Sequence, residues 1–128
     1  MPVSGNVEGR DERQQEHAQR EVDRGLLWRA MLESGAATGD QPPPEDPAPA
    51  VEAAPAHLGL AACALAILPV EDAQGQAEQP NLPGTIDQHP NWRRRLPGEA
   101  GTLLDAPDVA HRLETLAQAR RARRGAEG

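Results

Sequence analysis

The sequence lacks phenylalanine, tyrosine and lysine, so all 13 of its basic residues are arginine. Leucine, valine and isoleucine together make up about 16% of its 128 residues, below the roughly 20% that separates ordinary domains from highly charged disordered chains. A formal charge of −7 and 13 prolines also favour disorder. The composition therefore predicts a chain that, on its own, has difficulty burying enough apolar surface to offset its conformational entropy.

The single cysteine, Cys63, excludes an intramolecular disulfide and favours a reducing compartment. The first residues contain no apolar segment of the kind found in secretory signals. The longest apolar run, Leu58–Val70, is shorter than the roughly 20 residues needed to cross a bilayer. We therefore expect a soluble, cytoplasmic chain with no membrane contact.

The N-terminal third predicts one helical segment, residues 1–36. Arg10–Arg24 is dense in charges of both signs and is typical of a solvated helix. An amphipathic pattern with four-residue spacing begins at Val22, in which Val22, Leu26 and Ala30 form one series and Leu27 and Met31 another. Gly35 stands where a left-handed residue would end the helix.

The middle of the chain predicts a linker at residues 37–50, a short helix and then one strand. Asp40–Ala56 contains six prolines and is expected to form a stiff, extended spacer. A helix is expected over Val51–Leu60, kinked or delayed by Pro55. Cys63–Val70 is a short apolar run that predicts a fully buried strand. Because one strand cannot form a sheet, we expect its partners to lie outside these residues.

The C-terminal part predicts a helix with clear start and stop signals. Asp105 is a plausible N-cap, Pro107 suits the first turn, and Gly125 suits the stop. Asp108 and Arg112 have the spacing of an ion pair on one helix face. The expected buried stripe consists of Val109, Leu113 and Leu116.

Between the strand and this helix lies Asn81–Leu96, which reads NLPGTIDQHPNWRRRL. Its two prolines and its glycine exclude a regular helix or strand, and its polar side chains outnumber its apolar ones. A loop of this kind more often carries function than packing.

The combination of PVED, NLPGTID and HPNWRRR, in that order, resembles the C-terminal region of 4-alpha-glucanotransferases, the amylomaltases of glycoside hydrolase family 77. The resemblance implies an α/β fold: the C-terminal part of a (β/α)8 TIM barrel, with mainly helices, one buried strand and long loops. Residues 51–128 would form the last β/α unit, and residues 71–95 its substrate-facing loop. It implies α-1,4-glucans as substrates, retaining transfer to an acceptor 4-hydroxyl, and neither a metal nor an organic cofactor.

The resemblance also bears on site residues. Asn81, Thr85 and Asn91 can hydrogen-bond sugar hydroxyls, and the ring of Trp92 can stack on a pyranose. The alternative is that the asparagines satisfy turn backbone and Trp92 anchors the loop. Residues expected only to shape the backbone are Pro83 and Gly84.

No catalytic residue is expected in this chain. Glu71 and Asp72 follow the predicted strand directly, but adjacent side chains there point to opposite sides. The catalytic carboxylates of the resembled family lie upstream of the matching region. We therefore expect an inactive C-terminal fragment whose partner is the catalytic portion of the barrel. The alternatives are a noncatalytic glucan-binding or interaction fragment and a disordered acidic linker.

Two further functions are disfavoured. Arginine clusters occur at residues 93–95 and 120–124, but the chain as a whole is acidic, has few aromatic residues and contains no recognised nucleic-acid-binding module. The four histidines lack the spacing of metal ligands.

Overall fold

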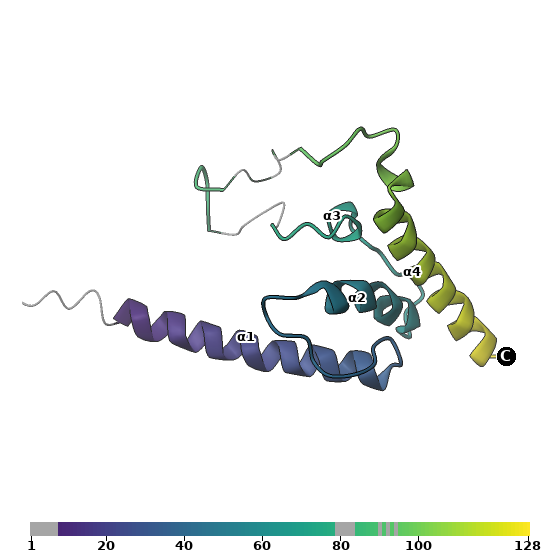
Figure 1. Ribbon diagram of the computed structural model, residues 1–128, viewed down its shortest axis with the longest axis horizontal. Coiled ribbons are helices and arrows are strands. Elements are labelled where there is room, and N and C mark those ends of the chain that lie inside the picture. Colours follow the sequence, from purple (N-terminus) through teal and green to yellow (C-terminus); the bar gives the residue numbers. More distant parts are fainter. Residues whose placement is uncertain (1–7, 79–83, 90, 92, 94) are drawn as a thin grey trace, which may run out of the picture.

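The computed structural model describes residues 8–78, 84–89, 91, 93 and 95–128 (Figure 1). Within these ranges the chain is helical and forms no strand. None of the described helices is long and apolar enough to span a membrane. The elements are α1 (Glu8–Glu33), α2 (Ala48–Leu60), α3 (Val70–Ala73), the 3₁₀ turn η2 (Leu103–Asp105) and α4 (Pro107–Ala126).

Helix α1 ends as the sequence predicts, because Gly35 follows it with a φ of 81°. The face it buries agrees with the predicted pattern only in part. Val22 and Leu26 are 55% and 58% exposed, whereas Trp28 and Met31 are buried. Of the predicted apolar pattern, Met31 is therefore buried, whereas Val22, Leu26 and Leu27 are exposed, because the large Trp28 indole sets the buried face.

The connection between α1 and α2 folds back along α1. Trp28 and Met31 form a small core with Ala37 and Ala53, and the Trp28 Nε1 donates to the carbonyl of Gly39 at 3.3 Å. Prolines 42–44 line the same side of α1, where they border a cavity of about 70 Å³ next to Trp28. The proline-rich stretch is thus packed against the helix that precedes it.

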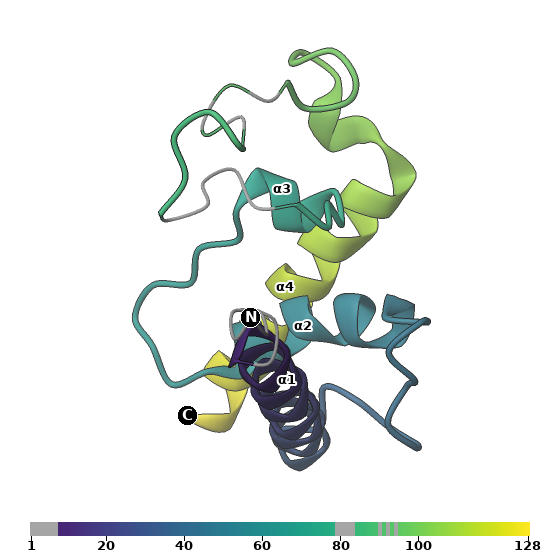
Figure 2. The ribbon, with the colours of Figure 1, turned by 90° about the vertical axis from the view of Figure 1, so that its left-hand side faces the viewer.

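Helix α2 begins at Ala48, with Pro49 in its first turn and Pro55 inside it. Pro55 therefore does not delay the helix as expected. Helix α2 contacts both α1 and α4 (Figure 2). Its approach to α4 is closest at Gly59, where an added Cβ would lie 2.6 Å from the Cβ of Ala119. The glycine allows the two helices to cross at this distance.

Helix α4 follows the sequence prediction in most respects. Pro107 lies in its first turn, and Val109 is fully buried. The predicted pair forms, with Arg112 Nη1 3.5 Å from Asp108 Oδ2. The expected cap is wrong, because Asp105 belongs to η2 and the N-cap residue is Ala106, which has no side chain able to bond the first turn.

The segment Cys63–Val70 does not form the predicted buried strand. Leu65 and Ile67 are 73% and 69% exposed, and the segment is irregular up to Val70, where α3 begins. Arginines of α4 bind its main chain: Arg120 donates to the carbonyls of Ala61 and Ala64, and Arg123 donates to that of Cys63. A strand requires a neighbouring ladder, and the described residues provide none.

Candidate functional site

The candidate site lies in the long loop between α3 and η2, residues 75–96, which we call the glucan loop after the substrate that the sequence resemblance implies. Helix α3 forms its first stem. The amide of Gly75 donates to the carbonyl of Asp72 at 3.0 Å, and the amide of Gln76 donates to that of Glu71 at 2.9 Å. With Gly75 at a φ of 68°, this is the Schellman arrangement that ends a helix. The chain therefore leaves α3 in a defined direction.

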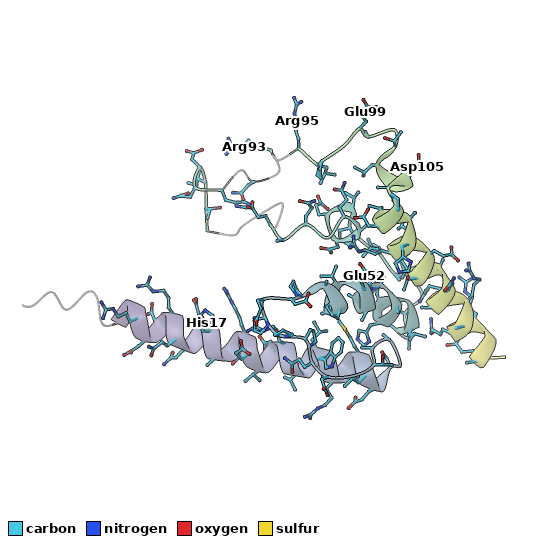
Figure 3. The ribbon with its side chains drawn as sticks, in the orientation of Figure 1. His17, Glu52, Arg93, Arg95, Glu99 and Asp105 are labelled. Atoms are coloured by element: carbon cyan, nitrogen blue, oxygen red, sulfur yellow. The ribbon has the colours of Figure 1, made fainter. Side chains whose placement is uncertain are left out.

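Arg112 of α4 secures this stem. Its Nη1 donates to the carbonyl of Ala73 at 2.8 Å, and its Nε and Nη2 donate to Glu52 Oε1 at 3.1 and 2.8 Å. Glu52 projects from α2 toward α3 and α4 (Figure 3). One guanidinium thus joins three helices, and its side chain is only 11% exposed.

The two ends of the glucan loop are also joined directly. The Nε2 of Gln74 donates to the carbonyl of Pro97 at 3.1 Å, although the two residues lie 23 positions apart. The loop is therefore closed at its base.

At the far part of the loop the structure brings two predicted site residues together. The Nδ2 of Asn91 donates to the Oγ1 of Thr85 at 3.0 Å and to its carbonyl at 3.2 Å. Gly84 precedes them with a φ of 83°, a backbone conformation that favours glycine. This part of the loop extends away from α3 and α4 (Figure 1). The other predicted residues, Asn81, Pro83 and Trp92, lie outside the described residues.

One exposed ion pair is described within the loop. Arg93 lies 3.8 Å from Asp87, and both side chains are largely exposed, so this pair contributes little to stability. Arg95 points away from the helices (Figure 3). In the described part of the chain, no three histidine, cysteine or acidic residues lie in an arrangement that could hold a metal ion.

One pair elsewhere resembles a nucleophile and its base. The Oγ of Ser34 lies 2.8 Å from the Nδ1 of His57. The same oxygen bonds the carbonyl of Met31 and accepts from the amide of Ala36. These contacts tie the end of α1 to α2, so the pair acts as a structural clamp.

Sequence reasoning missed the residues that hold the loop in place. It assigned Arg112 only to Asp108, one turn away, and gave no role to Gln74. The partners of Arg112 that hold the stem are Glu52 and Ala73, which lie 60 and 39 positions from it in the sequence. Helical spacing carries no information on contacts over such distances, so no signal in this single sequence identifies them.

Comparison with known proteins supports the resemblance seen in the motifs. Residues 7–101 match the family described as 4-alpha-glucanotransferase. The chain is 38% identical over 88 residues to 4-alpha-glucanotransferases of Mycobacterium bovis and Mycobacterium tuberculosis. This alignment covers 67% of the chain but 12% of the relatives' length. No solved structure matches significantly. The matched range contains the whole glucan loop, and the chain belongs to the 4-alpha-glucanotransferase family, glycoside hydrolase family 77.

Proposed function

We propose that this chain contributes a glucan-binding loop to an enzyme with 4-alpha-glucanotransferase activity. Such an enzyme transfers a segment of an α-1,4-glucan to the 4-hydroxyl of an acceptor glucan. The observation that carries the proposal is that the family match includes the entire glucan loop, in which Thr85 and Asn91 brace each other. The bond from Gln74 to Pro97 closes the base of the loop, and the bond between Thr85 and Asn91 holds these two polar side chains together. Such preorganisation lowers the entropic cost of binding.

The chemistry of the loop suits a sugar. Hydroxyl and amide groups match the alternating donors and acceptors of glucose hydroxyls. Thr85 and Asn91 form one such polar surface, and Asn81 and Trp92 add an amide and an aromatic ring in the same stretch of sequence. We propose Asn81, Thr85, Asn91 and Trp92 as the glucan contacts, with Pro83 and Gly84 shaping the backbone.

The chain itself is proposed to bind without catalysing transfer. Retaining glycosidases place two carboxyl groups about 5–5.5 Å apart on opposite sides of the bond that breaks. Glu71 and Asp72 are neighbours in the single turn of α3, so their side chains diverge by roughly 100°. Two carboxylates on one short turn cannot flank a glycosidic bond from both sides.

The surroundings of the loop are also proposed by analogy with the family. Residues 51–128 would form the last unit of a (β/α)8 barrel in a cytoplasmic enzyme, preceded by a linker at 37–50 and a helical segment at 1–36. The exposure of Leu65 and Ile67 supports this proposal, because large apolar side chains exposed in one short segment often mark a contact surface. The catalytic portion of a barrel is the partner that would cover them.

The proposed binding is tested by a nuclear magnetic resonance titration of the ¹⁵N-labelled chain with maltoheptaose. We expect concentration-dependent shifts at the Thr85 amide, the Asn91 side-chain amide and one of the two indole signals. Cellohexaose, a β-1,4-glucan, is the control ligand and should cause none. Asn91→Ala should abolish the response, whereas Gln118→Ala, which removes an exposed amide on α4, should leave it unchanged. The absence of shifts with maltoheptaose would overturn the proposal.

A noncatalytic glucan-binding module is the second candidate, favoured by the divergent carboxylates of α3. Both candidates predict that the purified chain alone does not act on maltotriose, and incubation with this sugar tests that shared expectation. Binding without release of glucose is the expected result. Formation of glucose together with longer maltodextrins would show that these residues catalyse transfer unaided.

A further inference from the structure

We propose that Arg112 is the positioning residue of the glucan loop, holding its first stem in the orientation that glucan binding requires; this inference rests on the proposed function. Arg112 does not belong to the loop. It lies on α4, beyond the residues that match the family. Its guanidinium nevertheless bonds the last carbonyl of α3, from which the loop departs.

The carbonyls at the end of α3 all accept hydrogen bonds. The Schellman bonds of Gly75 and Gln76 occupy the carbonyls of Asp72 and Glu71. The carbonyl of Ala73 takes its bond from Arg112. The turn of α3 is only four residues long, and so short a helix has little stability of its own. Its orientation therefore depends on the arginine bonded to its end.

The guanidinium is itself held from several sides. Glu52, on α2, accepts hydrogen bonds from two of the N–H groups of Arg112. Asp108, on α4, lies 3.5 Å from Nη1 of the same guanidinium. The other carboxylate oxygen of Glu52 lies 3.6 Å from His111 Nε2. A planar guanidinium with five donors can bond a carboxylate and a carbonyl at the same time, whereas a lysine ammonium cannot reproduce this fork. Arg112 thus transmits the position of α2 and α4 to the loop stem.

Gly75 shows how closely the stem and the arginine fit. A Cβ added at Gly75 would lie 3.4 Å from Arg112 Nη1, and the φ of 68° already disfavours any other residue. The base of the loop therefore packs directly on the guanidinium. The hydrogen bond from Gln74 to Pro97 then holds the other end of the loop next to this stem.

Helix α4 contains a matched control. Arg120 also donates to main-chain carbonyls, those of Ala61 and Ala64. Its targets precede α3 and do not form the stem. Arg112→Gln and Arg120→Gln therefore each remove guanidinium bonds to main-chain carbonyls from the same helix, and only the first should affect the loop. Glu52→Gln is a milder variant, because it weakens the support of Arg112 and leaves the arginine in place.

The experiment measures amide exchange without ligand and maltoheptaose binding on the full chain. In Arg112→Gln we expect amides of residues 73–76 to exchange about tenfold faster and the dissociation constant to rise about fivefold or more. Glu52→Gln should raise the exchange rate and the dissociation constant by smaller factors. Arg112→Lys should restore both quantities only partly toward the wild-type values. Arg120→Gln should match the wild type in both.

The outcomes separate this inference from the proposed function. Unchanged stem exchange in both Arg112→Gln and Glu52→Gln, or equal stem exchange in the Arg112 and Arg120 variants, overturns the positioning role. Wild-type affinity in Arg112→Gln, with faster stem exchange, also overturns it, since the stem would then not govern binding. If the wild type itself does not respond to maltoheptaose, the proposed function fails. Faster stem exchange confined to the Arg112 and Glu52 variants would then retain Arg112 as the anchor of the loop alone.

Discussion

Replacing Gly59 with alanine tests the helix crossing on which the fold depends. An added Cβ would lie 2.6 Å from the Cβ of Ala119 and 2.8 Å from the carbonyl oxygen of Leu116. Favourable contacts between carbon atoms lie at about 3.5–4.0 Å, so α2 and α4 would have to separate by roughly 1 Å. The oxygen belongs to the backbone of α4 and cannot rotate away.

The expected magnitude follows from two opposing terms. Alanine is favoured over glycine within a helix by about 1 kcal/mol, while overpacking a close contact costs about 1–3 kcal/mol or more. Because this contact is shorter than any ordinary one, we expect overpacking to dominate and Gly59→Ala to destabilise the chain by about 1–2 kcal/mol. In urea unfolding followed by circular dichroism, the midpoint should fall by roughly 0.5–1 M.

Gly25 provides the matched control, since it is also a glycine within a long helix. Its nearest atom to an added Cβ is the Gln41 side-chain oxygen at 3.6 Å, an ordinary contact. Gly25→Ala should therefore stabilise the chain by about 0.5–1 kcal/mol. Adding Ala119→Gly to Gly59→Ala should restore part of the lost stability. A Gly59→Ala variant as stable as the wild type would refute the close crossing of α2 and α4.

Three further changes test other parts of the structure. Leu65→Ser and Ile67→Ser should each alter the free energy of unfolding by less than about 0.5 kcal/mol, because both side chains are exposed; a loss above about 2 kcal/mol in urea unfolding would indicate a buried strand. Trp28→Ala should cost about 3–5 kcal/mol and reduce the helical signal at 222 nm, since its indole is the largest core side chain. Ser34→Ala and His57→Ala should each cost about 1 kcal/mol, and the double variant no more than either alone; additive losses would argue against their hydrogen bond.

The sequence predicted the helices better than the contacts between them. The end of α1 near Gly35 and the start of α4 at Pro107 agree with the structure, since local backbone preferences decide them. The strand at Cys63–Val70 was wrong in this chain, because a short apolar run is compatible with several structures. Its side chains become buried only where another element covers them.

The candidate site was predictable only in part. The motif identified the loop, and the structure brings Thr85 and Asn91 together as hydrogen-bonding partners. The residues that fix the base of the loop, Arg112 and Gln74, were not identified. Their partners depend on how distant helices pack, which is a property of the folded chain as a whole.

Arg120 and Arg123 bind the stretch from Ala61 to Ala64 through its main-chain oxygens. Every amino acid carries that carbonyl, so recognition here does not depend on which side chains the stretch presents. Substitutions can accumulate along it during evolution while its route over α4 persists. Only the two arginines need to be kept for these bonds to form. Relatives whose chain takes the same route over α4 can therefore differ in sequence at residues 61–64.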